Sequence, residues 1–346
     1  MRVTRIDEKL KALSKPGVES ISVLPLESSD ALIFCAGFEE RANEVLKKLC
    51  EAKKRISQIL IVQYVPENKN NMASEAIHLC SELGINAEVF IYDRENPQGF
   101  GGKTVSFFEN FSGRIYIDIS GMSRLLIVQL LVEMKKRPNS LNQVSLLYTE
   151  AKTYPPTKEE AEEALRNREQ NPHELMLLIS AGVLDICVVP ELSSTSMNGQ
   201  PSRLVAFPSF NPDQLNALRS SIQPSYLTYI HGIPPDDSLK WRPEIIRKLN
   251  LLESSPLLEE FDSSTLDYRG TLDVLLTIYQ NHGVIEKIIV APTGSKMQAV
   301  AVGIFKSFFS DIQIVFPASN QFASPEKYTQ GVNAMYRLPL DLFSSI

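Results

Sequence analysis

Residues 284–309 constrain the fold of this chain more than any other stretch. The segment VIEKIIVAPTGSKMQAVAVGIFKSFF contains an apolar run at Lys287–Val290, a short turn, and then apolar residues at helical spacing. The turn is Ala291-Pro292-Thr293-Gly294-Ser295-Lys296, which is small, hydroxylated and basic. The pattern predicts a buried β-strand that passes through a tight turn directly into an α-helix.

A turn of this kind is suited to an anion. The first backbone N–H groups of the helix have no partner within the helix, and the positive end of its dipole lies at the same place. Thr293, Ser295 and Lys296 add donors, and Gly294 and Met297 complete the turn. We therefore expect a ligand site of nucleotide type. The turn lacks the GxxxxGK[ST] frame of a P-loop, so ATP hydrolysis of that kind is not expected.

The same unit occurs earlier in the chain, at residues 113–134. GRIYIDISGMSRLLIVQLLVEM predicts a strand at Ile115–Ile119, a small basic turn, and a long helix. The turn residues are Ser120, Gly121, Met122, Ser123 and Arg124. Aligned on the second copy, Ser123-Arg124 falls on Ser295-Lys296. Tight packing of strand on helix would also select such residues, so a purely structural role for both turns stays open.

Further paired segments surround the two turns in the same order. Residues 32–49 pair with 204–221, residues 59–69 with 226–237, and VSLLYTEAKTYPP with IQIVFPASNQFASP. The repeat predicts an α/β protein with two pseudo-symmetric Rossmann-like halves, each a parallel sheet in three layers, and an insertion between them. We place the first half at residues 1–150, the connector and insertion at 151–202, and the second half at 203–346.

Composition excludes several classes of protein. The chain has 346 residues, 43% of them hydrophobic and 22% charged, and a formal net charge of −6. That charge argues against a protein that coats long nucleic acid. No apolar run is long enough for a membrane span, and the polar start lacks the core of a signal peptide, so we expect a cytoplasmic protein. The four cysteines are scattered, and we expect no metal site, no disulfide framework and no cofactor.

Ligands of open parallel sheets bind beyond the carboxyl ends of the strands. Aromatic, hydroxyl and cationic side chains dominate these positions, and few nucleophiles occur, which favours recognition over catalysis. His231 lies at a strand end, where it is either a general base or, more simply, a structural histidine. Outside the two turns, the candidate ligand-binding residues are Gly37, Phe38, Arg41, Ser209, Phe210 and His231.

The turn APTGSKMQAV closely resembles that of CRISPR-associated Rossmann-fold (CARF) domains, whose strand runs into a Thr-Gly-Gly-Thr-Lys type turn followed by Met. DISGMSRLL is a looser version, and neither turn has the full Gly-Gly-Thr-Lys. The resemblance covers Thr293–Met297 and Ser120–Arg124, supported by the doubled architecture, which also occurs in SAVED domains. It implies binding of a cyclic oligonucleotide between two pseudo-symmetric copies in prokaryotic antiviral defence. The sequence shows no recognisable effector.

Three functional hypotheses follow. In the first, the chain is a sensor or regulatory subunit that binds a small nucleotide through Arg124 and Lys296, with an effector protein as a separate partner chain. In the second, the same turns hold a cyclic oligonucleotide that a metal-independent ring nuclease cleaves, with catalytic residues that the sequence does not identify. In the third, the chain is a structural subunit of a defence complex. All three involve neither long nucleic acid nor a membrane.

Overall fold

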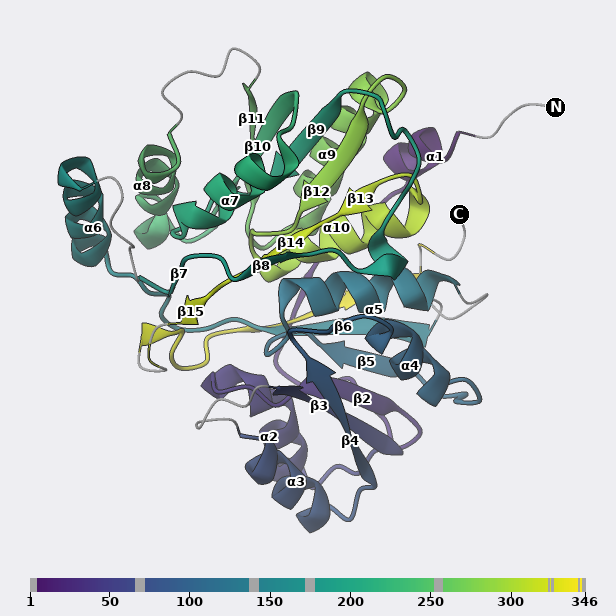
Figure 1. The fold of residues 1–346 in the computed structure, drawn as a ribbon. Helices are drawn as coiled ribbons and strands as arrows, with labels where there is room; N and C mark the ends of the chain where they lie inside the picture. Colours follow the sequence, from purple (N-terminus) through teal and green to yellow (C-terminus); the bar gives the residue numbers. More distant parts are fainter. Residues whose placement is uncertain are drawn as a thin grey trace. The chain divides into compact units, whose positions relative to one another are not determined.

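The computed structural model describes residues 5–65, 72–136, 143–171, 178–251, 258–322, 324, 327–341 and 343. The chain divides into two compact units. The seven-stranded unit comprises Ser14–Tyr154 and Tyr328–Ile346, and the five-stranded unit comprises Met1–Leu13 and Pro155–Lys327. Each unit is an α/β layered structure (Figure 1).

The seven-stranded sheet has the order β1-β16-β6-β5-β2-β3-β4. Neighbouring strands from β6 to β4 are parallel, whereas β16 is antiparallel to both β6 and β1. The strand ALIFC, which is β2 and lies between β5 and β3, is buried at every position, as expected for a parallel strand covered on both faces. The strands are β1 (Glu19–Ile21), β2 (Ala31–Cys35), β3 (Gln58–Val65), β4 (Ala87–Asp93), β5 (Ile115–Asp118), β6 (Val144–Thr149) and β16 (Met335–Pro339).

Helices cover both faces of this sheet. The apolar sides of two helices, α2 and α3, pack on Leu32, Phe34, Ile59 and Ile61. Figure 1 shows α4 and α5 together on the other face, where the Tyr92 hydroxyl donates to Gln129 at 2.8 Å. The helices are η1 (Glu40–Asn43), α2 (Glu44–Glu51), α3 (Ala73–Glu82), α4 (Phe100–Phe107) and α5 (Arg124–Lys136).

The five-stranded sheet has the order β11-β10-β9-β12-β13 and is parallel throughout. One of its faces packs on α7 through Leu215 and Leu218, and α9 packs on α10, with the rings of Tyr279 and Phe305 6.0 Å apart. The strands are β9 (Ser202–Ala206), β10 (Tyr226–Ile233), β11 (Leu258–Ser264), β12 (Lys287–Ala291) and β13 (Gln313–Ile314). The helices are α1 (Ile6–Ala12), α6 (Lys158–Gln170), η3 (Pro190–Leu192), α7 (Pro212–Ile222), η4 (Asp237–Leu239), α8 (Arg242–Leu249), α9 (Tyr268–His282) and α10 (Lys296–Phe308).

The two sheets repeat one topology. In chain order, β2, β3, β4, β5 and β6 correspond to β9, β10, β11, β12 and β13, and both sets lie in the spatial order third, second, first, fourth, fifth. This is a Rossmann-like order. The predicted fold class, an α/β protein with two Rossmann-like units, is confirmed.

The distribution of the chain between the units differs from the boundaries expected at 150 and 202. Residues 328–346 return to the seven-stranded unit, because β16 inserts between β1 and β6 and its Leu338 is buried there. Residues 155–202 belong to the five-stranded unit. The insertion strands lie outside both large sheets, in two-stranded pairs. These pairs are β7 (Ser180–Ala181) with β15 (Gln321–Phe322), and β8 (Asp185–Cys187) with β14 (Phe316–Ala318).

Two segments with weak sequence signals form regular structure. The segment around residue 260, which carries several charges, forms β11 and pairs with β10 along its whole length. The glycine-rich GFGGK begins at Gly99 with a positive φ of 74° and then enters α4. Among the described residues, no helix combines the length and the hydropathy needed to span a bilayer.

Candidate functional site

The turn between β5 and α5 is held mainly by its own hydrogen bonds. Buried Asp118 accepts from the Ser120 backbone N–H at 2.9 Å and also from the Ser120 hydroxyl, whose oxygen accepts from the Thr149 N–H at 2.7 Å. The Ser123 N–H donates to the Tyr64 hydroxyl at 2.6 Å, and the Ser123 side chain accepts from Leu126 N–H. Asp118, Ser120 and Ser123 therefore shape the turn.

The remaining small residues of this turn are required by close packing. A Cβ at Gly121 would lie 2.3 Å from the Cys35 carbonyl oxygen, and Met122 is 1% exposed. A Cβ at Gly37 would lie 3.4 Å from that of Ala42 and 3.9 Å from Gly121. The turn thus packs against the loop that follows β2. Of the five turn residues, Arg124 is the one with a cationic side chain.

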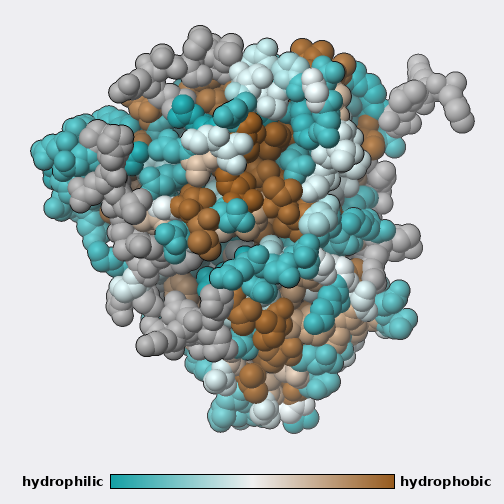
Figure 2. All heavy atoms as spheres, viewed as in Figure 1, coloured by the Kyte–Doolittle hydropathy of each residue, from teal (hydrophilic) through white to brown (hydrophobic). Residues whose placement is uncertain are grey.

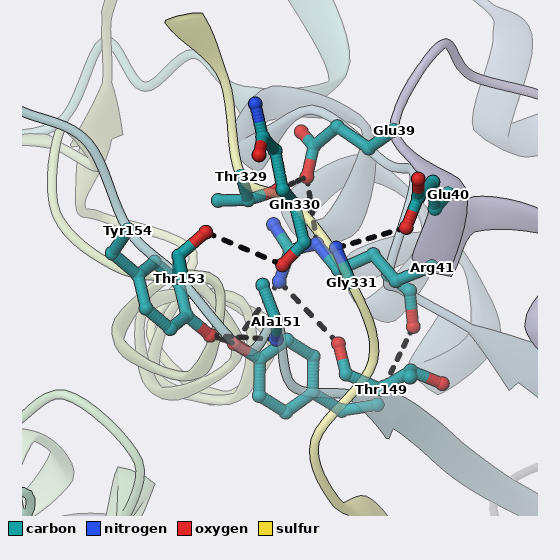
Figure 3. A network of polar contacts seen from close by, with 12 residues as sticks. Glu39, Glu40, Arg41, Thr149, Ala151, Thr153, Tyr154, Thr329, Gln330 and Gly331 are labelled. Atoms are coloured by element: carbon teal, nitrogen blue, oxygen red, sulfur yellow. Dashed lines mark hydrogen bonds and ion pairs between the residues drawn. The ribbon is translucent and has the colours of Figure 1, made fainter. Parts of the chain in front are cut away.

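Arg41 lies next to this turn, and its guanidinium is engaged in hydrogen bonds within the protein. Its side chain is 6% exposed, and its Nε donates to Glu39 at 2.6 Å (Figure 3). Its Nη1 donates to the Tyr148 hydroxyl at 3.3 Å and to the Thr149 carbonyl at 3.4 Å. Burial acts to lower the pKa of Arg41, but the Glu39 carboxylate and the two tyrosines, Tyr148 and Tyr154, outweigh it and raise the pKa.

A segment from the far end of the chain completes this network (Figure 3). The Thr329 hydroxyl donates to Glu39, and the Gly331 N–H donates to Glu40 at 2.9 Å. The Gln330 carbonyl accepts from the Thr153 N–H at 3.1 Å. The ring of Tyr328 meets that of Phe38 edge-on at 4.6 Å. Residues 328–331 thus cover the loop after β2.

The charges of Arg124 and Arg94 both act on Tyr328. Burial lowers the pKa of Arg124, while Glu39 and Tyr328 oppose that effect and the like charge of Arg41 adds to it. The pKa of Tyr328 is raised by burial and by Glu39, against the opposing charges of Arg124 and Arg94. The Arg94 guanidinium lies over the Tyr64 ring at 5.6 Å. The guanidinium groups of three arginines therefore lie with half-buried tyrosines at the carboxyl edge of this sheet. We call this set the arginine–tyrosine cluster; its members are Arg41, Arg94, Arg124, Tyr64, Tyr148, Tyr154 and Tyr328.

The corresponding turn of the five-stranded unit is more completely closed on itself. Thr293 donates to the Phe207 carbonyl at 2.7 Å and accepts from the Phe207 N–H, so it ties β12 to β9. Ser295 and Gln298 form a capping box at the start of α10, with hydrogen bonds of 2.8 and 3.1 Å. A Cβ at Gly294 would lie 2.3 Å from the Gln298 side chain. Met297 is buried, and Lys296 is partly exposed at the first position of α10.

The other candidates in this unit are also engaged. Phe210 packs among residues of α6 and α8, with the Arg242 guanidinium 4.6 Å from its ring. The Ser209 hydroxyl accepts from the Asn211 N–H at 3.1 Å. His231 is 2% exposed, and its Nε2 lies 2.7 Å from Glu260; burial lowers its pKa, and the hydrogen bond to Glu260 opposes the shift. Each of these three side chains is therefore held by contacts within the unit.

Arg41 and Arg124 were candidates from the sequence, whereas residues 328–331, which contact Phe38, Glu39 and Glu40, were not. Tyr154 and Tyr328 were not among the candidates, because nothing in the sequence indicates that residues 328–331 return to the first sheet. Arg94, Glu39 and Tyr64 each follow or end a strand, and that position is the signal that points to them. Among the described residues, no group of three or more His, Cys, Asp or Glu side chains is placed to hold a metal ion.

The fold and the cluster define a Rossmann-like α/β protein with a cationic, aromatic edge. No family model and no curated protein matches the chain. It is similar to a universal stress protein from Archaeoglobus fulgidus DSM 4304, at 14% identity over 84% of this chain and 97% of that one, with a TM-score of 0.23. It is also similar to the cytoplasmic domain of a prokaryotic cation chloride cotransporter, at 7% identity over 85% and 96%, with a TM-score of 0.24.

Proposed function

We propose that the arginine–tyrosine cluster binds a small phosphate-bearing ligand of the nucleotide class. The observation that supports this is that Arg41 and Arg124 share one carboxylate neighbour, Glu39, while Arg94 and Arg124 both act on Tyr328. Partly buried guanidinium groups are costly unless anions accompany them, and a phosphate is an anion that two forks can grip at once. The position beyond the carboxyl ends of the strands agrees with such a ligand.

The residues divide into two roles in this proposal. Arg41 is a positioning residue, because Glu39, Tyr148 and Thr149 already occupy its guanidinium. Arg124 and Arg94 supply the charge for phosphate oxygens. Tyr64, Tyr148, Tyr154 and Tyr328 are all half-buried, so each leaves part of its ring or hydroxyl for stacking or hydrogen bonding with a base.

The resemblance of the two turns to CARF domains narrows the proposed ligand to a cyclic oligonucleotide and the proposed role to a sensor subunit in antiviral defence. Its effector would then be a separate chain. The shared topology of the two units agrees with this proposal, since a repeated sheet provides two equivalent edges. The closed capping box at Ser295 leaves Lys296 as the residue of the second turn that would contribute to binding in the five-stranded unit.

Calorimetric titration with cyclic oligoadenylates, linear oligoadenylates and inorganic phosphate tests the proposal. A charge-assisted hydrogen bond is worth about 1.5–3 kcal/mol, so Arg124→Ala should weaken binding roughly 10- to 150-fold. Lys136→Ala is the matched control, because Lys136 ends the same helix and pairs with Glu133. Lys296→Ala tests the second turn separately.

Binding of a cyclic oligoadenylate by the wild type with the same affinity in Arg124→Ala would refute the assigned cluster. Failure of the wild type to bind any of these probes would refute the ligand class. Chromatography of the titrated samples separates the sensor from a nuclease, because a sensor returns the cyclic ligand intact.

A further inference from the structure

The outer strands of the two sheets carry different side chains. The strands β4 and β11 occupy equivalent positions. Each is an edge strand: β4 pairs with β3 in one sheet, and β11 pairs with β10 in the other. Through the registers of β3 with β4 and of β10 with β11, Val89 corresponds to Glu260, and Ile91 corresponds to Asp262. The same position in the fold is therefore apolar in the seven-stranded unit and charged in the five-stranded unit.

The edge of the five-stranded unit is protected by charge. Glu260 lies 2.7 Å from His231 Nε2, and Asp262 forms an ion pair with Arg247 of α8. Charged side chains on an edge strand discourage pairing with another chain. Because the same topology carries acidic residues here, apolar residues at this position are not a requirement of the fold.

The edge of the seven-stranded unit carries the opposite chemistry. Val89 is 36% exposed and Ile91 is 49% exposed, and Ile77 of the adjacent helix α3 is 43% exposed. Figure 2 shows hydrophobic side chains gathered over the region where β4 runs in Figure 1. Among the described residues, β4 has one strand neighbour, β3. An exposed apolar edge strand is a template for pairing with a further strand.

The backbone of β4 is also oriented for such pairing. The N–H of Ile59 donates to the carbonyl of Asn86, and the N–H of Arg94 donates to that of Val65. Hydrogen bonds of a parallel ladder alternate along the strand, so the even-numbered residues of β4 bond to β3. The odd-numbered residues direct their N–H and C=O groups to the open edge, and these residues are Ala87, Val89, Ile91 and Asp93.

We propose that β4 pairs antiparallel with β4 of a second copy of this chain, about a dyad at Phe90. In this register, Val89 of each copy lies opposite Ile91 of the other in a hydrogen-bonded pair. Glu88 lies opposite Tyr92, and Ala87 lies opposite Asp93, so no like charges face each other. A shift of the dyad to Val89 or Ile91 leaves end residues unpaired.

A second copy of the chain is the partner that fits this edge, because β4 is complementary to itself in the proposed register. Pairing satisfies the outward backbone groups of both strands and places the two Val89–Ile91 pairs side by side on the face that carries Ile77. The inference concerns a different surface from the arginine–tyrosine cluster and does not depend on the proposed ligand.

Sedimentation velocity over a range of about 1–100 µM gives the first test. The wild type should dimerise, and the double variant Val89→Glu/Ile91→Asp, which copies the edge of the five-stranded unit, should be monomeric with an unchanged circular dichroism spectrum. Val23→Asp is the control, since Val23 is 78% exposed elsewhere in the same unit and this variant should still dimerise. A monomeric wild type, or a double variant that dimerises like the wild type, would overturn the proposal.

A second measurement tests the register. In the proposed pairing the two Phe90 residues form a non-hydrogen-bonded pair with Cα atoms about 4.5 Å apart, a separation that suits a disulfide. Phe90→Cys should therefore form a covalent dimer under mild oxidation. In Glu88→Cys the two cysteines lie about 13 Å apart along the strands and should not cross-link. Cross-linking of Glu88→Cys but not Phe90→Cys would contradict this register.

Discussion

Arg41 shows how burial changes the role of a residue. Its place after β2 suggests a cation that meets the ligand, yet Arg41 is 5% exposed and its guanidinium is bonded to Glu39, Tyr148 and the Thr149 carbonyl. Removing one partner of a buried ion pair is strongly destabilising, because the other charge is left without compensation. Arg41 is therefore a poor residue with which to test binding, whereas Arg124, at the first position of α5, is a good one.

His231 leads to a prediction about pH. Burial lowers its pKa below the ordinary 6.5, and Arg247 of α8 acts in the same direction against Glu260 and Asp262 of β11. The unfolded chain therefore binds a proton more readily than the native one. The stability that neutral His231 contributes is complete above pH 6.5 and is lost as pH falls through the lowered pKa.

Thermal melting between pH 7.5 and 5 measures this effect. The wild type should lose more stability over the acidic part of the range than His231→Gln, which keeps a polar group beside Glu260 but does not titrate. Because the two proteins share every other titrating group, the difference between their curves isolates His231. Parallel curves would show that His231 does not carry this pH dependence.

At the scale of the element, the two strand–turn–helix units differ in how tightly their glycines are held. Gly121→Ala would drive a Cβ against the backbone carbonyl of Cys35, whereas Gly294→Ala would meet the side chain of Gln298. A side chain can move, at the cost of its capping bond to Ser295. Both changes should destabilise their own unit by roughly 1–3 kcal/mol, with Gly121→Ala at the upper end.

Gly270→Ala is the matched control for these variants. Apart from its chain neighbours and the backbone of its own helix, α9, no described heavy atom lies within 4 Å of a Cβ at Gly270, so alanine should stabilise the helix by about 0.5–1 kcal/mol. Denaturant melts of the three variants test the order. A Gly121→Ala protein as stable as the wild type would mean that the turn is looser than the packing indicates.

Much of the element order could be predicted from the sequence, because buried parallel strands are continuous apolar runs that stand out between helices. The strand β11 is hard to predict from the sequence because LEEFDSS carries the charges of an edge strand. The turn serines were expected to contact a ligand, and the structure uses their hydroxyls to hold the turn. Local sequence does not reveal which of two hydrogen-bond partners a hydroxyl will have, since the partners come from distant segments.

At the scale of the whole molecule, the seven-stranded sheet is complete only when β16, from the C-terminal part of the chain, has joined it. It lies between β1 and β6, and its Met335 and Leu338 are buried. The short, alternating sequence MYRLP gives little indication of a strand whose partner β6 lies so far back in the chain.

Truncation after Lys327 should therefore unfold the seven-stranded unit selectively. Without β16, β1 loses its partner, and β6 becomes an edge strand whose backbone groups on that side have no partner strand. Hydrogen exchange should show lost protection in β2 and β5 and retained protection in β9 and β12. Leu338→Asp should weaken the same strands, because it places an unpaired charge at a position that is 1% exposed. Unchanged exchange in β2 and β5 would show that the unit does not need β16.

The return of the chain to its first sheet sets an order of events on the ribosome. The strands β2 to β6 emerge early, but β16 emerges only after the whole of Pro155–Lys327 has been made. At about 5–20 residues per second, the early strands wait on the order of ten to forty seconds for their last partner. The later-encoded unit is therefore the first to have all its strands, and the nascent chain carries an open β6 edge for most of its synthesis.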